Sequence, residues 1–170
     1  MIRQGKRDDV EDILEIYNYA IESTTAIYAY KKKTLKEQEK WYDMKISEGY
    51  PVYVYEENGR VVGFSTYGAF RVYPGFKYTV EHSVYVHKDY GKRGIGTALL
   101  DKIILEIGQK EYATVIAFID SENDTSIRLH EKAGFEYSGK ITKAGYKFEK
   151  WLDTVIYQKN LSGPKTPTED

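Results

Sequence analysis

The chain of 170 residues contains no cysteine, and nowhere do eighteen apolar residues follow one another. Without cysteine there is no disulfide framework and no cysteine-ligated zinc site, which fits an intracellular protein. Without a long apolar run there is no candidate for a membrane-spanning helix. The stretch Met1–Asp8 also lacks the apolar core of a secretory signal. We therefore expect a cytoplasmic protein that is not held at a membrane.

An excess of charge of either sign is missing too. The chain has 25 Lys and Arg side chains against 26 Asp and Glu, so nothing in its composition would neutralise a nucleic acid backbone. We expect small-molecule partners and no nucleic acid. Tyrosine, in contrast, is abundant with 17 copies, which suits a partly polar cleft or a packed interface. Many of these rings can equally lie on a sheet surface, where β-propensity favours them.

Hydrophobic periodicity divides the chain into helices and strands. Asp8 or Asp9 can cap the first helix, Thr34 and Glu37 have the spacing of a capping box, and Asn58-Gly59 predicts a hairpin turn. The expected elements are helices at Asp9–Ile21, Thr34–Ile46, Gly94–Ile107 and Asn123–Ala133, and strands at Pro51–Tyr55, Val61–Tyr67, Lys77–His87, Ala113–Ile119, Gly139–Phe148 and Trp151–Tyr157.

With a short strand before the first helix, this order of elements predicts one α/β domain built on a single mixed sheet. We find neither an internal repeat nor a linker. The domain is expected to span residues 1–160, and the proline-containing residues 161–170 are expected to form a disordered tail.

The most informative segment is the glycine-rich turn Gly91–Thr97 (Gly-Lys-Arg-Gly-Ile-Gly-Thr), which follows an expected strand and opens a helix. Such a turn directs several backbone N–H groups to one point, where the helix dipole favours negative charge. Gly94 and Gly96 let the backbone approach phosphate oxygens, and Lys92 and Arg93 add positive charge. The turn therefore predicts a pyrophosphate site, although a plain strand-to-helix turn with glycine at its bend is the alternative.

Two common phosphate loops do not fit this turn. The Gly-Lys-Ser/Thr ending of a Walker A loop is absent, and the dinucleotide-binding fingerprint lacks its third glycine because position 99 is leucine. The pyrophosphate must belong to another carrier.

Three spaced motifs resemble those of a known family. The turn, the pair Asn123-x-x-Ser126 and the stretch Leu129–Phe135 (Leu-His-Glu-Lys-Ala-Gly-Phe) are similar to the acetyl-CoA motifs of the GNAT superfamily of N-acetyltransferases, whose turn reads Gln/Arg-x-x-Gly-x-Gly/Ala. The resemblance implies the GNAT fold, a mixed and mostly antiparallel sheet of about seven strands, flanked by about four helices and splayed at strands 4 and 5.

One branch of this superfamily is matched more closely. Thr79–Val86 (Thr-Val-Glu-His-Ser-Val-Tyr-Val) and Gly145–Asp153 are similar to signatures of the phosphinothricin and methionine sulfoximine acetyltransferases, and Ile16–Asn18 with Ala26–Tyr28 fits the same branch. The resemblance runs from about Ile2 to Gln158.

The sequence departs from the family pattern at two places. Gly91 stands where the family usually has Gln or Arg, so one side-chain contact to phosphate is missing or is supplied by Lys92. The segment Tyr28–Lys33 lacks the acidic residue that many relatives carry near the acceptor. The second departure bears on which acceptor is used.

The resemblance implies an acetyl-CoA-dependent N-acetyltransferase that needs no metal. It implies direct transfer to the amine of a small amino-acid-like acceptor such as phosphinothricin, methionine sulfoximine or methionine sulfone. Two alternatives stay open: another amine (a peptide N-terminus, a polyamine or an aminoglycoside), or a CoA-binding module without catalysis. By analogy with the branch, the enzyme is expected to be a homodimer whose interface uses Trp151 and Tyr157.

Two residues are candidates for catalysis. Glu81 lies three residues before the expected cofactor strand among apolar and aromatic neighbours that would raise its pKa, as a general base requires, although a solvated surface glutamate is the alternative. His130 takes the place where many relatives have a general acid, or it is a helix histidine bonded to a nearby carbonyl. His82 and His87 are weaker candidates, since His82 should point away from Glu81 on an ideal strand.

The remaining site residues follow from the resemblance. Cofactor contacts are expected from the backbone of Val84, Tyr85 and Val86, from the turn residues Lys92, Arg93, Gly94, Ile95, Gly96 and Thr97, and from Asn123, which can also be a helix N-cap. Acceptor contacts are expected from Arg71, Gly75, Phe76 and Tyr28. Arg71 could hold a carboxylate in bidentate fashion or be a plain surface arginine.

Overall fold

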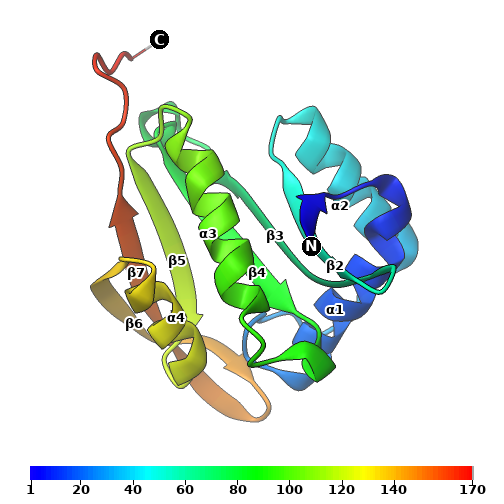
Figure 1. Cartoon of the computed structure of the whole chain (residues 1–170). Coiled ribbons are helices and arrows are strands. Elements are labelled where there is room, and N and C mark those ends of the chain that lie inside the picture. Colours follow the sequence, from blue (N-terminus) through cyan, green and yellow to red (C-terminus); the bar gives the residue numbers. More distant parts are fainter. Residues whose placement is uncertain (170) are drawn as a thin grey trace. The chain divides into compact units, whose positions relative to one another are not determined.

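The computed structural model describes residues 1–169, in which seven strands form one sheet in the order β1-β2-β3-β4-β5-β7-β6 (Figure 1). The elements are β1 (Ile2–Gln4), α1 (Val10–Ser23), α2 (Leu35–Ser47), β2 (Val52–Glu57), β3 (Arg60–Ala69), β4 (Thr79–Val86), α3 (Ile95–Gly108), β5 (Thr114–Asp120), α4 (Asp124–Lys132), β6 (Glu136–Lys147) and β7 (Lys150–Asn160). Strands β4 and β5 pair in parallel, whereas β1-β2, β2-β3, β5-β7 and β6-β7 are antiparallel. The predicted fold class is confirmed. Within residues 1–169, no helix has the length and apolar character needed to span a bilayer.

The chain divides into two compact units that share two strands. The first unit holds Met1–Thr66 and Ser83–Leu100, and the second holds Tyr67–His82 and the chain from Asp101 onward. The boundary falls within β3 and again within β4.

In the first unit, the apolar stripe predicted for the first helix becomes one buried face of α1. Val10, Ile13 and Ile16 are buried on this face and pack with Tyr42 of α2 and Val54 of β2. The burial of these side chains, rather than helix propensity alone, stabilises α1.

The two predicted helix caps have different outcomes. At α2 the capping box is confirmed, because Thr34 Oγ1 accepts from the Glu37 N–H at 3.3 Å while the Glu37 carboxylate accepts from the Thr34 N–H at 2.7 Å. At α1 the prediction of a side-chain cap was wrong. Asp9 occupies the N-cap position but makes no cap bond, because its carboxylate binds Arg3 and accepts from the Lys6 N–H at 2.6 Å.

The hairpin of β2 and β3 turns at Asn58 and Gly59, as predicted. Their φ angles are 52° and 77°, which are the left-handed values that a two-residue hairpin turn requires. Asparagine and glycine adopt these angles at low cost.

Helix α3 begins close against β3, and Gly63 makes this approach possible. A Cβ atom on Gly63 would lie 2.9 Å from Leu99 Cδ1, 3.1 Å from the Tyr85 carbonyl oxygen and 3.2 Å from Ile95 Cγ2. The buried Ser65 hydroxyl donates to the Leu99 carbonyl at 3.2 Å. The first two turns of α3 are therefore fixed by direct packing on β3.

In the second unit, the parallel pairing of β4 with β5 is short. It covers Thr79, Val80 and Glu81, which pair with Thr114, Val115 and Ile116, although β4 continues to Val86 and β5 to Asp120. The predicted splay at strands 4 and 5 is confirmed, and it begins directly after Glu81.

The last two strands form a hairpin that is longer than predicted at its outer ends. Backbone pairing begins at Glu136 and Gln158, beyond the residues whose side chains favour strands. The hairpin turns at Phe148 and Glu149, with φ angles of 52° and 60°. Neither residue is glycine, so the turn holds two left-handed residues at some cost in free energy.

The segment after β7 has neither helix nor strand up to residue 169. The Leu161 N–H donates to the Ala113 carbonyl at 2.8 Å, the Thr168 N–H donates to the Tyr78 hydroxyl at 3.1 Å, and Lys77 Nζ donates to Thr168 Oγ1 at 3.2 Å. Disorder of residues 161–170 stays a prediction, and it would require these bonds to break. Asp170 lies outside the described residues.

We predict that Gly63→Ala lowers the free energy of unfolding by about 1–3 kcal/mol, because the new methyl group overlaps packed atoms of α3 and β4. Urea unfolding followed by circular dichroism measures the change. Gly108→Ala is the matched control, since a Cβ there meets nothing within 4 Å. This control should leave stability equal or slightly higher. Equal destabilisation by the two substitutions would show that Gly63 has no special packing role.

Candidate functional site

The turn between β4 and α3 has a backbone shape that gathers N–H groups. Its φ angles alternate, with −61° at Gly91, 61° at Lys92 and 78° at Gly94. Alternation of this kind points successive N–H groups to one side and makes an anion-binding concavity. The first bond inside the helix runs from the Ala98 N–H to the Gly94 carbonyl, so the N–H groups of 95–97 have no helical acceptor. The residues present fit a pyrophosphate.

The side chains of the turn differ in what they can contribute. Lys92 is exposed at the bend. Arg93 forms an ion pair of 2.6 Å with Glu57 and lies 5.1 Å from the Tyr90 ring centroid, so its charge is partly offset. Ile95 is buried with an exposed fraction of 2%, so only its backbone can face a ligand.

His87 fixes the entry to the turn, a role that the sequence did not reveal. The backbone N–H of His87 donates to the Val62 carbonyl at 2.8 Å. The ring nitrogen Nδ1 of His87 accepts from the backbone N–H of Asp89 at 3.3 Å. A neutral ring must then carry its proton on Nε2, which lies 3.2 Å from the Glu15 carboxylate. Because Glu15 is 72 positions away in sequence, no local spacing could indicate this contact.

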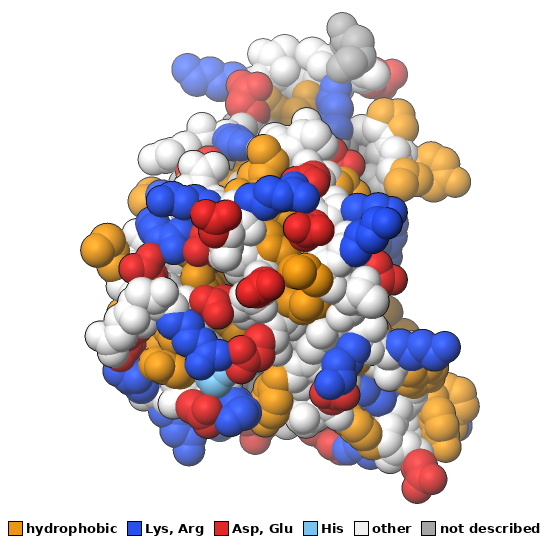
Figure 2. Space-filling model, turned by 90° about the vertical axis from the view of Figure 1, so that its right-hand side faces the viewer, with side chains coloured by type: hydrophobic (Ala, Val, Ile, Leu, Met, Phe, Trp, Pro, Cys, Tyr) orange, Lys and Arg blue, Asp and Glu red, His pale blue; other side chains and the backbone are white. Residues whose placement is uncertain are grey.

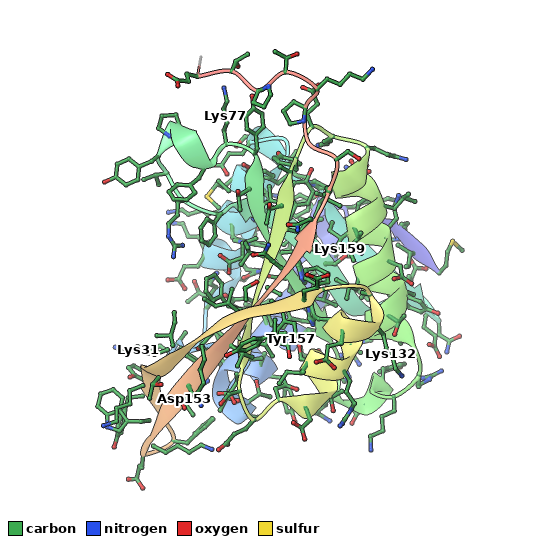
Figure 3. The ribbon with its side chains drawn as sticks, turned by 90° about the vertical axis from the view of Figure 1, so that its left-hand side faces the viewer. Lys31, Lys77, Lys132, Asp153, Tyr157 and Lys159 are labelled. Atoms are coloured by element: carbon green, nitrogen blue, oxygen red, sulfur yellow. The ribbon has the colours of Figure 1, made fainter. Side chains whose placement is uncertain are left out.

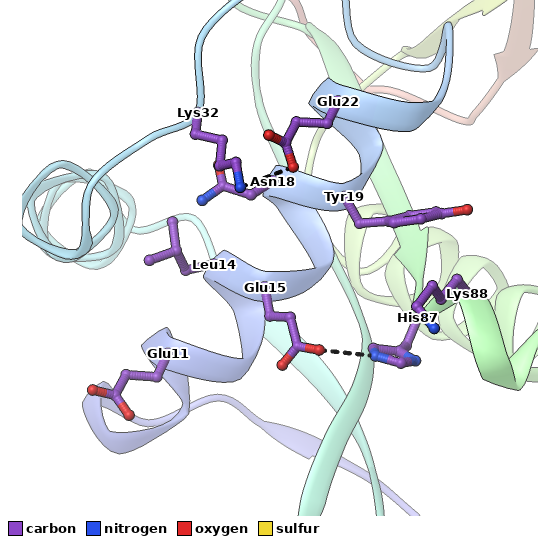
Figure 4. A pocket seen from close by; sticks show the side chains of 9 residues that line it. All are labelled: Glu11, Leu14, Glu15, Asn18, Tyr19, Glu22, Lys32, His87 and Lys88. Carbon is purple, nitrogen blue, oxygen red and sulfur yellow. Dashed lines mark hydrogen bonds and ion pairs between the residues drawn. The ribbon is translucent and has the colours of Figure 1, made fainter.

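A cavity of about 350 Å³ lies beside His87 in the first unit (Figure 4). It is lined by α1 side chains between Glu11 and Glu22 and by Lys32, His87 and Lys88. Two of its acidic groups have basic partners, because Lys32 lies 2.9 Å from Glu22 and His87 Nε2 lies 3.2 Å from Glu15. Basic and acidic side chains are interleaved over the face of the molecule seen in Figure 2. Of the residues considered for the site, only the weaker candidate His87 lines this cavity.

The predicted cofactor strand uses its side chains for packing. Tyr85 meets Tyr17 edge to face at 5.7 Å and lies 5.3 Å from Phe64. Val84 and Val86 pack against the apolar cluster at the start of α3. The side chains of this strand are thus committed to packing, and a contact of its backbone with a pantetheine arm stays a prediction.

The predicted base lies in the second unit, where β4 leaves β5. Glu81 is half-buried and pairs in register with Ile116. The next residue, His82, is buried on the opposite side of the strand, as the alternation of a strand requires. Glu81 is thus neither fully solvated nor sealed in the core.

His130 belongs to a buried pair of imidazoles. Its Nδ1 lies 2.7 Å from the Ser126 carbonyl oxygen, and its Nε2 lies 3.1 Å from His82 Nε2. The two rings stack at 25° with centroids 5.0 Å apart, and Phe135 packs against both. A bond to a neighbouring carbonyl was the alternative considered for His130, and the structure has that bond. The catalytic role stays a prediction.

The surroundings of the pair oppose positive charge. Burial, and to a smaller extent the adjacent His130, lower the pKa of His82 from 6.5 to about 3. Burial also lowers the pKa of His130, while the bond to the Ser126 carbonyl acts in the other direction. At neutral pH both rings are therefore uncharged, so His130 could serve as a general acid only after taking up a proton.

Asn123 is the N-cap of α4. Its Oδ1 accepts from the Ser126 N–H at 3.1 Å, which confirms the capping alternative. The helix ends before Gly134, whose φ of 81° suits the C-cap that glycine commonly forms. The N-cap bond at the start of α4 uses the side-chain oxygen of Asn123, so the amide nitrogen of Asn123 is not used in it.

The predicted acceptor residues do not all fall in one unit. Arg71 and Phe76 lie in the second unit. There the ring centroid of Phe70 lies 5.5 Å from that of Phe76 and 6.2 Å from that of Phe118. The exposed guanidinium of Arg71 lies 4.3 Å from the Phe70 ring and donates to the Phe70 carbonyl. Gly75 borders open space, and Tyr28 lies in the loop between α1 and α2 of the first unit.

Residues 1–169 contain no group of three or more His, Cys, Asp or Glu side chains that could hold a metal ion.

The chain matches the model of the acetyltransferase (GNAT) family over residues 13–135. It is 39% identical over 166 residues to the L-methionine sulfoximine/L-methionine sulfone acetyltransferase of Salmonella typhimurium, covering 98% of this chain and 97% of the relative. It is 37% identical over 166 residues to an L-amino acid N-acyltransferase of Escherichia coli, covering 98% and 96%. The solved phosphinothricin acetyltransferase of Sinorhizobium meliloti in complex with acetyl-CoA superposes with a TM-score of 0.94 at 30% identity, covering 98% and 91%.

We predict that the free energy of unfolding falls as the pH is lowered from 7 to 5. The unfolded chain binds protons on His82 and His130 below about pH 6.5, whereas the folded chain, with both pKa values lowered, binds fewer. Each imidazole adds at most about 1.4 kcal/mol per pH unit to the decline. Urea titrations at several pH values measure the slope. His82→Gln removes one titrating group and should reduce it, and an unchanged slope would contradict the assignment.

Proposed function

Because the chain belongs to the acetyltransferase (GNAT) family, we propose that it transfers the acetyl group of acetyl-CoA directly to the amine of a small amino-acid-like acceptor. Phosphinothricin, methionine sulfoximine and methionine sulfone are the proposed acceptors. The observation that carries this proposal is the likeness, over nearly the whole chain, to relatives named for amino-acid acetylation. Acetyl-CoA as the donor also favours the cytoplasm as the place of action.

The turn at the start of α3 is the proposed pyrophosphate site. The N–H groups of Ile95, Gly96 and Thr97 would donate to phosphate oxygens, supported by the helix dipole. Lys92 would add charge in place of the Gln or Arg that Gly91 replaces. The backbone of Val84–Val86 would bind the pantetheine arm. When bound, acetyl-CoA supplies the thioester whose carbonyl carbon is attacked.

Glu81 is the proposed general base. As the amine nitrogen forms its bond to the carbonyl carbon, one proton passes from the amine to the Glu81 carboxylate, directly or through a water molecule. As the carbon–sulfur bond breaks, the leaving CoA thiolate would take up the proton that Glu81 has received, directly or through water, so that Glu81 returns to its carboxylate form and the transfer balances. His130 is retained as a second catalytic candidate. Its acid role requires a proton on both ring nitrogens when the thiolate leaves.

Acceptor recognition is proposed at the aromatic cluster of the second unit. The guanidinium of Arg71 is exposed and suited to a bidentate bond with a carboxylate, and Phe76 offers an apolar wall. Gly75 leaves room at this turn. Tyr28 and the amide nitrogen of Asn123 are proposed as further contacts, the first to the acceptor and the second to the pantetheine arm.

We propose a homodimer whose interface includes the β6–β7 hairpin, because Tyr146, Phe148 and Trp151 have exposed fractions of 46%, 51% and 59%. Tyr157 is not part of this proposal. This side chain, labelled in Figure 3, is 6% exposed. Its hydroxyl donates to the Glu131 carboxylate at 3.1 Å. A monomer mass in sedimentation equilibrium would contradict the dimer.

The test of the function is an amine panel. Purified protein with acetyl-CoA is offered phosphinothricin, methionine sulfoximine, methionine sulfone, free amino acids, spermidine and a peptide, while release of CoA thiol is followed. The protein has no cysteine to add to the signal. We expect turnover with the amino-acid analogues. Turnover confined to spermidine or the peptide would point to another acceptor, and CoA binding without turnover would point to a non-catalytic module.

We predict that Glu81→Gln lowers kcat by about 100-fold or more while leaving the affinity for acetyl-CoA unchanged, because the amide cannot take the proton. Steady-state rates and CoA binding by calorimetry measure the two effects. Glu111→Gln, at an exposed position near the end of α3, is the control for loss of one carboxylate. If kcat falls less than threefold, Glu81 has no part in proton transfer.

A further inference from the structure

The hydrogen bonds around the buried imidazole pair define where its protons lie. A carbonyl oxygen can only accept, so His130 Nδ1 must carry a proton that it donates to Ser126 at 2.7 Å. A neutral His130 then has a bare Nε2. The 3.1 Å contact between the two Nε2 atoms therefore requires the proton to be on His82, which donates it to His130.

The uncharged pair admits one arrangement of protons. His82 carries its proton on Nε2, which leaves its Nδ1 as a bare acceptor. This Nδ1 is fully buried, and no group among residues 1–169 donates to it. A second proton on His82 would place a charge, and an N–H without an acceptor, in the interior. The free-energy cost of the buried charge and of the unpaired N–H keeps His82 neutral, so His82 remains the donor in its bond to His130.

No charged group reaches the pair to alter this arrangement. The other ring packed on both imidazoles is Phe135. Besides burial, the pKa of His82 is lowered by His130, and the pKa of His130 is affected by its bond to the Ser126 carbonyl and by no charged side chain. Within residues 1–169, neither ring has a carboxylate partner that would stabilise an imidazolium.

We propose that His82 is a positioning residue for His130. By donating its Nε2–H, His82 holds the His130 ring in the Nδ1–H tautomer and in one orientation on α4, beside the strand that carries Glu81. Both nitrogens of His130 are then engaged within the protein, so the pair acts by holding α4 against this strand and not through the acid role, which would require a second proton. The bond also ties α4 to β4 at the residue where pairing with β5 has ended. This inference rests on the proposed function for its catalytic consequence, whereas the tautomer itself does not depend on any activity.

The tautomer can be observed directly, because the chain has only three histidines. In long-range proton–nitrogen correlation spectra of ¹⁵N-labelled protein, bare and protonated ring nitrogens have separate shifts. Spectra of His82→Gln and His87→Gln assign the three rings by subtraction. We expect His130 to be protonated on Nδ1 and His82 on Nε2, unchanged between pH 6 and 8. Protonation of His130 on Nε2 or on both nitrogens would overturn the proposal.

Two substitutions of His82 distinguish the effect of its Nε2–H donor from the effect of the volume of its ring. His82→Phe keeps a ring of similar size but cannot donate, so the buried Nε2 of His130 loses its partner. We expect kcat to fall about tenfold, with the KM for acetyl-CoA within about twofold, and His130 to lose its single-tautomer spectrum. His82→Gln retains an N–H in nearly the same place and should retain kcat within about threefold, together with the His130 tautomer.

A double-mutant cycle tests whether His82 acts through His130. Adding His82→Phe to His130→Phe should cost nothing further in kcat, whereas independent effects would add. Additive effects, or an unchanged kcat and spectrum in His82→Phe, would overturn the positioning role. Circular dichroism checks folding of each variant, and His82→Gln keeps the test valid if His82→Phe does not fold. Absence of wild-type turnover would refute the proposed function and the catalytic role of the pair, while the tautomers would still be read from the spectra.

Discussion

The close approach of α3 to β3 at Gly63 is the constraint on which the anion-binding turn depends. A loop that gathers N–H groups is electrostatically unfavourable when empty, because like partial charges face one another. Local sequence cannot hold such a loop. Here it is held from both sides, by Ile95 and Leu99 packed on β3 and by His87 bonded to Val62 and Asp89. Packing outside the turn therefore supplies the rigidity, and the glycines within it supply only the permitted angles.

In the second unit, strand pairing ends at the point where two titratable side chains point to opposite sides of β4. Pairing of β4 with β5 stops after Glu81, and the next side chain, His82, turns inward to bond His130 on α4. One side of the strand thus presents a half-buried carboxylate, and the other presents a neutral hydrogen-bonded pair. The opening of the sheet and the placement of its titratable groups come from the same two residues.

Sequence reasoning predicted what depends on neighbours in the chain. Periodicity located the helices and strands, the Thr34–Glu37 box was confirmed, and the strand-turn-helix pattern identified the turn. It missed what depends on distant partners. Asp9 fails to cap α1 because Arg3 claims its carboxylate, and the roles of His82 and His87 come from residues 48 and 72 positions away. A strand histidine looks the same in sequence whether it faces water or another imidazole.

The interleaving of the two units has a consequence for the newly made chain. The first unit is interrupted in sequence by Tyr67–His82. The residues that pack against Gly63, among them Leu99, are therefore the last part of the first unit to be synthesised. At roughly 5–20 residues per second of synthesis, the β2–β3 hairpin waits for a few seconds with that side open. Residues of the second unit are already outside the ribosome during this wait. Neither unit can therefore be finished on the ribosome before the other has begun.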